Sequence, residues 1–334
     1  MPWEAEEDAV KAITSHRYGP PDVLELEEVD DPVVGDGDVL VRVRAASVNP
    51  RDWHLLRGLP YLARPQFGGL RRPRHRVLGS DLAGWVEAVG RGVTRFRPGD
   101  EVFADALTGC FAEYVRVPEE LLALKPANLS FEQAAAVPLA AVTALQGLRD
   151  HGRVQPGQRV LIVGASGGVG TFAVQLARSL GAEVTGVCSA RNLELVRSLG
   201  ADHVIDYARE DFTRLGRRYD LVFQLAGTRS PAASRRALTA RGTLLPSSGE
   251  SSGRWIGPLD RMLAAVALSP LVSQRLVPFL AKPSGDDLRA LAELIESGTV
   301  RPVIDRTYPL AETAAAIRYL EQGHARGKVV ITVP

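Results

Sequence analysis

A glycine-rich stretch near the middle of the chain constrains the fold more than any other feature. Residues 164–170 read Gly-Ala-Ser-Gly-Gly-Val-Gly; they follow the apolar run 158–163 and precede a helical pattern over 171–180. Strand, glycine loop and helix in this order are typical of a nucleotide-binding βαβ unit, in which the helix N-terminus offers unpaired N–H groups to a phosphate. The stretch therefore predicts a parallel sheet that binds a dinucleotide.

The dinucleotide fingerprint G-x-G-x-x-G fits this loop with an alanine in first place, as Ala165, Gly167 and Gly170. Glycine is needed there because the backbone must approach the pyrophosphate and because helix and strand must pack closely. We therefore expect these residues of the loop to bind the cofactor: Ala165, Ser166, Gly167, Gly168, Val169 and Gly170.

The end of the next expected strand, residues 183–188, indicates which nicotinamide cofactor is bound. An NAD site usually places Asp or Glu about 20 residues after the glycines, to accept from the ribose 2′-hydroxyl. Here the chain carries Ser189 and Arg191 and no carboxylate. A hydroxyl donor and a guanidinium suit the 2′-phosphate of NADPH, although Arg191 also fits an ordinary surface position at a helix start.

The same loop matches a second pattern, the nucleophile elbow G-x-S-x-G of α/β-hydrolases, with Ser166 at its centre. Asp305 and His324 follow in the order that such a triad requires. Against a hydrolase, a large β-rich region precedes the loop, and Gly170 has no role in an elbow. The pattern also recurs over residues 249–253, which shows how readily it arises by chance.

The hydrophobic pattern divides the chain into two regions with different periodicities. Residues 11–130 are rich in short strand patterns and turns, with period-2 alternation over 39–43. Strand and helix patterns alternate after Ser130, which with Gln133 forms a capping box for a helix over 131–137. This alternation predicts βαβ units, and the segment from Val303 returns to strand, helix and strand.

Several stretches together resemble the zinc-independent medium-chain dehydrogenases/reductases, of the quinone oxidoreductase (zeta-crystallin-like) branch. The matching stretches are residues 46–50, 78–84, 97–102, 135–138, 143–144, 164–170, 198–202, 204–207 and 327–329. The resemblance covers nearly everything from Lys11 onward. It implies an α/β fold with a GroES-like, β-rich catalytic domain from residues 11–130 and 284–334. A Rossmann domain that binds NADPH on a doubly wound parallel sheet would span 131–283, after an N-terminal extension over 1–10.

The resemblance also assigns cofactor contacts outside the glycine loop. It implies that Asn49 and Thr143 approach the ribose and the nicotinamide, and that Ser189 and Tyr207 face the 2′-phosphate. Lys328, in the matching stretch 327–329, is a further cofactor-binding residue. The lysine usual in relatives on the helix after Ser189 aligns near Asn192, which is a departure, and Arg191 one residue earlier is its expected substitute.

No metal is expected. The zinc-dependent relatives need a cysteine near Asn49 and Gly-His-Glu where residues 79–81 read Gly-Ser-Asp. A structural zinc site needs four clustered cysteines, and the chain has only Cys110 and Cys188.

Without a Lewis acid, the hydride acceptor must already be electrophilic, as a quinone or another α,β-unsaturated carbonyl is. His54 aligns with a position that is often tyrosine in relatives, and we expect it to donate a proton or hydrogen bond to the substrate. Asp52 either orients His54 or caps a helix. Trp53, Tyr61 and Phe67 are the expected pocket walls, although core packing is the commoner role of such aromatic residues.

Two alternatives remain open: an alkenal or enoyl reductase of longer-chain substrates, whose pocket the segment 60–76 would shape, and a non-catalytic NADPH-binding protein. A formal net charge of +1 from 40 basic and 39 acidic residues gives no reason to expect a nucleic acid or membrane partner. The acidic start and two cysteines favour a cytoplasmic enzyme. The resemblance implies a homodimer that pairs through an edge strand over 275–280, but it is only modestly favoured, because Pro278 would remove a donor from that edge.

Overall fold

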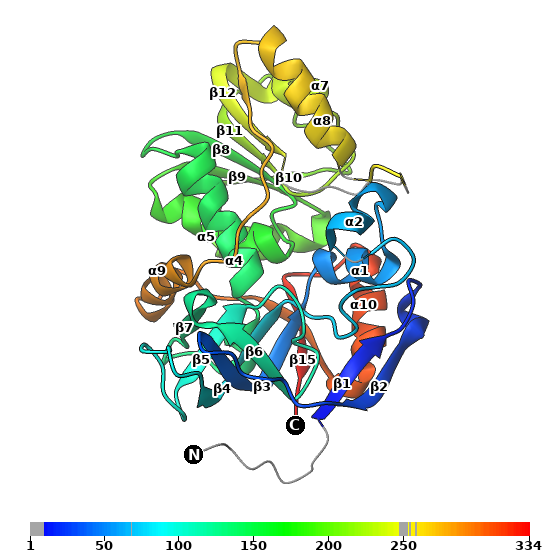
Figure 1. The fold of residues 1–334 in the computed structure, drawn as a ribbon. Helices are drawn as coiled ribbons and strands as arrows, with labels where there is room; N and C mark the ends of the chain where they lie inside the picture. The colour runs from blue at the N-terminus through cyan, green and yellow to red at the C-terminus, as the bar shows by residue number, and fades with distance from the viewer. Residues whose placement is uncertain (1–9, 68, 247–252, 254, 258) are drawn as a thin grey trace.

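The protein has two large β-sheets, one in each half of the molecule, and a separate two-stranded hairpin (Figure 1). The computed structural model describes residues 10–67, 69–246, 253, 255–257 and 259–334, so residues 1–9 of the expected extension lie outside it. The sheets and the helices between them confirm the α/β fold with one β-rich and one parallel-sheet domain.

The upper sheet in Figure 1 is the doubly wound parallel sheet that the glycine stretch predicted. Its strands pair in the order β10-β9-β8-β11-β12-β13, and every pair is parallel. The strands are β8 (Arg159–Val163), β9 (Glu183–Cys188), β10 (His203–Asp206), β11 (Tyr219–Gln224), β12 (Leu238–Pro246) and β13 (Arg275–Leu276). The helices of this half are α4 (Pro138–Gln146), α5 (Gly168–Ser179), α6 (Leu193–Ser198), α7 (Pro231–Ser234) and α8 (Leu259–Leu268).

The lower sheet combines strands from both parts of the chain that flank the parallel sheet. Its order is β14-β15-β3-β4-β5-β7, with β6 also paired to β3, and β15 runs antiparallel to β3. The strands are β3 (Asp38–Val48), β4 (Asp81–Val89), β5 (Glu101–Asp105), β6 (Tyr114–Pro118), β7 (Leu122–Leu124), β14 (Ile304–Pro309) and β15 (Lys328–Thr332). The hairpin is β1 (Val10–Ser15) with β2 (Leu24–Val29), and the helices here are α1 (Pro50–Arg57), α2 (Arg64–Phe67), α3 (Phe131–Ala135), α9 (Gly285–Glu296) and α10 (Thr313–Glu321).

Local signals in the sequence explain several element boundaries. The capping box is present, since Gln133 N donates to Ser130 Oγ and Ser130 N donates to Gln133 Oε1. The strand expected over 275–280 is wrong in length: β13 covers only Arg275–Leu276. Pro278 has no N–H group, so the ladder cannot continue through it.

One hydrophobic cluster runs through both halves of the molecule. It includes Ala45 and Phe103 from the lower sheet, Val160 and Phe172 from the β8–α5 unit, and buried residues of α4. Because this core is shared, the glycine loop after β8 is held against the lower sheet as well as its own.

We expect Gly170→Ala to destabilise the fold. A Cβ atom at this position would lie 2.1 Å from Gly164 O, in backbone that cannot move without disturbing the β8–α5 packing. Overpacking of this kind costs about 1–3 kcal/mol. Urea denaturation should show that loss for Gly170→Ala and less than about 0.5 kcal/mol for the control Gly37→Ala, whose Cβ would meet nothing within 4 Å. Equal effects would contradict the close packing of helix and strand.

Candidate active site

The loop between β8 and α5 makes its tight turn at Gly164, where φ is +89°. The fingerprint placed the first position at Ala165, which is instead a fully buried residue whose N–H donates to Val187 O. A Cβ at Gly164 would lie 2.8 Å from Ala226 Cβ, so position 164 needs glycine for both conformation and space.

Gly167 differs from its neighbours because nothing in the chain itself requires a glycine there. Its φ of −84° suits any residue, and a Cβ would meet only Gly164 O, at 3.5 Å. The N-terminus of α5 begins at the next residue, so its unpaired N–H groups lie beside this open space. A backbone left uncovered at a helix N-terminus fits the close approach of a pyrophosphate, which is what NADPH would bring.

The carboxyl ends of β9 and β10 lie side by side next to this loop. Asp206 is in register with Cys188, and Tyr207 N donates to Cys188 O, so Ser189 and Tyr207 follow adjacent strand ends. The Tyr207 side chain is exposed. Arg191 is exposed, and its guanidinium donates to His324 O at 2.7 Å. The structure thus brings Ser189 and Tyr207 together, and directs Arg191 toward the chain segment before β15.

A buried polar cluster lies on the lower sheet, facing the glycine loop from the start of β15. Its members are Ser47, Asn49, Asp52, Ser80, Asp81 and Lys328, all at most 3% exposed. Asp81 Oδ2 accepts from Ser47 Oγ (2.8 Å), Asn49 Nδ2 (3.0 Å) and Lys328 Nζ (3.1 Å). Lys328 Nζ also donates to Asn49 Oδ1 at 2.5 Å.

Asp81 further connects this cluster to α4. Its Oδ1 accepts from Leu139 N at 2.9 Å, and Thr143 one turn later donates its hydroxyl to Leu139 O at 2.7 Å. The Asp81 carboxylate therefore holds the three expected cofactor residues of this region. It bonds directly to Asn49 and Lys328, and it positions Thr143 through Leu139. In the sequence Asp81 stands out only as a position of the absent zinc site; its role here depends on the pairing of β4 with β3, which places it opposite Ser47.

Asp52 is fully buried and caps α1. Its Oδ2 accepts from Asn49 N at 2.7 Å and its Oδ1 from Ser80 Oγ at 3.0 Å. Burial, with a smaller contribution from the charge of Asp81, raises the pKa of Asp52 to about 7 despite the lowering effect of these two donors. Burial likewise raises the pKa of Asp105 to about 6, although Arg51 lies 2.8 Å away.

His54 stacks on Trp53, with ring centroids 3.7 Å apart, and its Nδ1 is buried without a hydrogen-bond partner among the described residues. Burial lowers the pKa of His54, which favours the neutral imidazole. These contacts favour the capping role of Asp52 over the orientation of His54. One carboxylate oxygen accepts from the N-cap residue Asn49 and the other from Ser80, and neither hydrogen bond involves His54. Trp53 packs against the core of the lower domain.

Tyr61 contacts the opposite half of the molecule. Its ring meets Trp255 edge-on at 5.4 Å between centroids, and Leu62 N donates to Trp255 O at 3.3 Å. Arg64 lies over the other side of the Tyr61 ring. The third expected pocket residue, Phe67, has a side chain outside the described residues.

The residues of the rival hydrolase triad have other partners. Ser166 Oγ accepts from Asn192 Nδ2 at 2.9 Å, whereas Asp305 Oδ2 accepts from Tyr319 OH at 2.6 Å and from Arg326 N. His324 contributes its carbonyl group to Arg191. The arrangement offers no acid–base relay to Ser166 within the described part of the chain.

The residues at the positions of the zinc ligands do not fit zinc. Asn49, Ser80 and Asp81 offer an amide, a hydroxyl and a carboxylate that are already hydrogen-bonded within the buried polar cluster. Asn49 Nδ2 donates to Asp81, Ser80 Oγ donates to Asp52, and the Lys328 ammonium balances the Asp81 charge. Zinc sites of this fold family use cysteine and histidine ligands, which these positions lack. Among the described residues, the group close enough to share an ion is His16, Glu25 and Glu27, on the β1–β2 hairpin.

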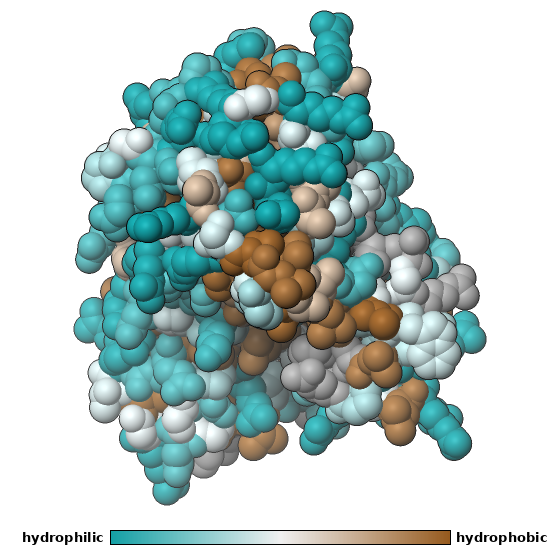
Figure 2. Space-filling model, turned by 90° about the horizontal axis from the view of Figure 1, so that it is seen from above, coloured by the Kyte–Doolittle hydropathy of each residue, from teal (hydrophilic) through white to brown (hydrophobic). Residues whose placement is uncertain are grey.

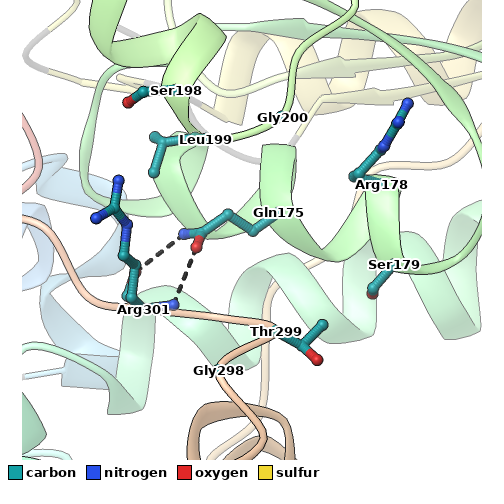
Figure 3. A pocket seen from close by; sticks show the side chains of 9 residues that line it. All are labelled: Gln175, Arg178, Ser179, Ser198, Leu199, Gly200, Gly298, Thr299 and Arg301. Carbon is teal, nitrogen blue, oxygen red and sulfur yellow. Dashed lines mark hydrogen bonds between the residues drawn. The ribbon is translucent and has the colours of Figure 1, made fainter.

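A shallow pocket of about 280 Å³ opens elsewhere, near the C-terminal ends of α5 and α6 (Figure 3). Its lining residues are Gln175, Arg178, Ser179, Ser198, Leu199, Gly200, Gly298, Thr299 and Arg301. Gln175 is fully paired there with the backbone of Arg301 and with Thr171 O. The hydroxyls of Ser179 and Ser198 donate to Leu176 O and Leu195 O of their own helices, so neither proton is available to a molecule in the pocket.

Comparison with known proteins agrees with this geometry. Residues 35–127 match the family model of the alcohol dehydrogenase GroES-like domain, and residues 199–331 match that of the zinc-binding dehydrogenases. An NADPH-dependent alkenal/one oxidoreductase of Arabidopsis thaliana is 36% identical, over 96% of this chain and 79% of its own length. The chain belongs to the quinone oxidoreductase-like medium-chain dehydrogenases/reductases.

Solved structures of the family superpose on the whole chain. The quinone oxidoreductase of Coxiella burnetii has a TM-score of 0.84 at 32% identity and covers 98% of this chain and 100% of its own. The Escherichia coli quinone oxidoreductase in complex with NADPH has a TM-score of 0.82 at 26% identity, with 97% and 100% covered. No described helix has the length and apolar character needed to cross a bilayer.

The buried Asp52 should make stability depend on pH. Its pKa of about 7 in the folded protein lies above about 3.9 in the unfolded chain, so the folded state binds the proton more tightly and stability falls as pH rises from about 4 to 7. Asp52→Asn keeps the cap without this ionisation. Urea denaturation should show the variant gaining about 1–3 kcal/mol relative to the wild type between pH 5 and pH 8. A constant difference across this range would contradict the buried carboxyl.

Proposed function

We propose that this protein is an NADPH-dependent reductase that transfers a hydride to a quinone or another α,β-unsaturated carbonyl without a metal. The observation that carries the proposal is the open backbone at Gly167 and the N-terminus of α5, with Ser189 rather than a carboxylate at the end of β9. The names of the relatives, which include both alkenal/one and quinone oxidoreductases, support this substrate class.

NADPH, when bound, supplies the hydride, and the chain supplies position and charge. Gly167, Gly168 and the α5 N-terminus would hold the pyrophosphate, and Ser189 with Tyr207 the 2′-phosphate. Asn49, Thr143 and Lys328 would approach the ribose and nicotinamide, fixed in place by Asp81. Since Lys328 has three N–H donors and two are used within the buried polar cluster, one remains for the cofactor.

The proposal is tested by following the loss of nicotinamide absorbance after 1,4-benzoquinone, and then an alkenal, is added to the protein with NADPH or NADH. A chelator is present throughout. We expect chelator-resistant oxidation that is faster with NADPH than with NADH. The acceptor that gives the faster oxidation of the cofactor shows whether quinones or longer-chain alkenals are the preferred substrates. Loss of activity with chelator would overturn the metal-free reaction, and binding of NADPH without turnover of any acceptor would leave a binding protein.

We propose His54 as the group that donates a hydrogen bond or proton to the substrate oxygen. His54→Phe keeps a ring of similar size without a donor, so kcat with benzoquinone should fall about 10- to 100-fold. His54→Tyr restores an O–H donor at a position where relatives often carry tyrosine, and it should retain most of the activity. Equal kcat values for the two variants would remove His54 from the reaction. The Kd for NADPH is the control and should stay unchanged in both.

We further propose a homodimer that pairs along β13, the edge strand of the parallel sheet. On the face seen from above in Figure 2, hydrophobic residues gather near the centre, and α8 at this end of the molecule exposes Leu263 (60%) and Val266 (56%).

Two further expectations stay predictions. One is the division into a catalytic domain (11–130 and 284–334) and an NADPH-binding domain (131–283), and the other is the location in the cytoplasm.

A further inference from the structure

Asn192 lies just before α6 and joins two loops that come from different strands. Its side chain is 3% exposed, and its Nδ2 donates to Ser166 Oγ at 2.9 Å and to Ser189 Oγ at 3.2 Å. Ser166 belongs to the glycine loop after β8, and Ser189 to the end of β9. The Asn192 Oδ1 atom is buried and has no hydrogen-bond partner in the described part of the chain.

The direction of these two hydrogen bonds decides what the serines can do. A hydroxyl group has one proton to donate and two lone pairs that accept. Because Asn192 donates to both oxygens, each serine keeps its own proton for another acceptor. Across the described ranges neither hydroxyl donates to a residue of the chain. Two O–H donors are therefore held in place and left unused, one on each side of Asn192.

We propose that Asn192 is a positioning residue for NADPH, which orients the Ser166 hydroxyl toward the pyrophosphate and the Ser189 hydroxyl toward the 2′-phosphate. The inference rests on the proposed function, because it takes NADPH as the cofactor. Asn192 would act on the phosphates indirectly, through two neutral hydroxyls.

The bound phosphates would stabilise this orientation of the amide. With the amide reversed, both serine protons would point to Oδ1 and their lone pairs would face acceptor-only phosphate oxygens, which is repulsive. The observed orientation leaves Oδ1 as a buried acceptor, which costs free energy unless a donor reaches it. A ribose hydroxyl is such a donor, so the orphaned atom fits a nucleotide at this place.

The test compares Kd values for NADPH, NADH and 2′,5′-ADP, measured by calorimetry on the full chain, for the wild type and Asn192→Asp. The aspartate accepts both serine protons and adds a negative charge, so the Kd for NADPH and for 2′,5′-ADP should rise about 10- to 100-fold. The Kd for NADH, which lacks the 2′-phosphate, should rise less. Asn128→Asp is the matched control, because Asn128 also donates through its amide, to Ile295 O, away from the glycine loop; it should change none of these values.

A double-mutant cycle separates positioning from a merely structural role. Ser189→Ala should weaken NADPH binding in the wild type and add little in Asn192→Asp, since the serine proton is already withdrawn there. Additive effects, with an unchanged preference for NADPH over NADH in Asn192→Asp, would overturn the inference. If Asn192→Asp does not fold, Asn192→Ala replaces it, with the same reduced preference and the same non-additivity expected.

The two hypotheses fail in different ways. A wild-type protein that binds NADPH no more tightly than NADH would overturn the proposed function, whatever the variants do. A wild type that prefers NADPH, together with variants that keep this preference, would overturn only the role of Asn192.

Discussion

The site depends on a short backbone connection between two sheets that share no strand. Gly167 and Gly327 form a parallel bridge, and Gly327 N donates to Ser166 O at 2.9 Å. The next residue, Lys328, begins β15 and extends its ammonium group into the buried polar cluster. The glycine loop of one half is thus fixed to the residue that immediately precedes β15 in the other half. A Cβ at Gly327 would lie 2.3 Å from Val303 O, so this connection requires glycine.

The electrostatics of the buried polar cluster follow from the same connection. Asp81 sits without exposure on β4, where an isolated carboxylate would be costly, and Lys328 brings the balancing charge from the end of the chain. Asp105 is balanced by Arg51. Among the described residues no such cation lies within hydrogen-bond distance of Asp52, and burial raises the pKa of this carboxyl to about 7. The lower face of the site is thereby close to neutral, which suits a polyanionic cofactor approaching from the other side.

Much of the fold followed from local signals in the sequence. The glycine stretch, the strands of residues 183–188 and 203–206 and the Ser130 capping box were all predicted at or near their observed bounds. The length of β13 was not predicted correctly. Whether the missing N–H group of Pro278 ends the strand depends on which side of the strand is paired, and the sequence does not show this. The tight turn at Gly164 was not predicted, because the fingerprint fitted to Ala165, Gly167 and Gly170 says nothing of the φ angle of the residue before it.

The candidate site was less accessible to sequence analysis, because its bonds join residues far apart in the chain. Lys328 and Asn49 are 279 positions apart, and no spacing rule links them to Asp81. From the sequence, Asn192 is only a departure from the resembled family. Its contacts could not be predicted, because it hydrogen-bonds to two serines that follow different strands. The role of Asp52 as a cap, by contrast, was one of the two alternatives that the sequence left open.

The contact between Tyr61 and Trp255 places a mechanical condition on the enzyme. The two domains are attached at the Gly167–Gly327 bridge and again at this aromatic pair, on a different pair of segments. Both attachments act in addition to the hydrophobic cluster that the two halves share. A hinge motion that separates the segments around Tyr61 and Trp255 would cost the ring contact and the Leu62–Trp255 hydrogen bond as well as contacts of the shared core.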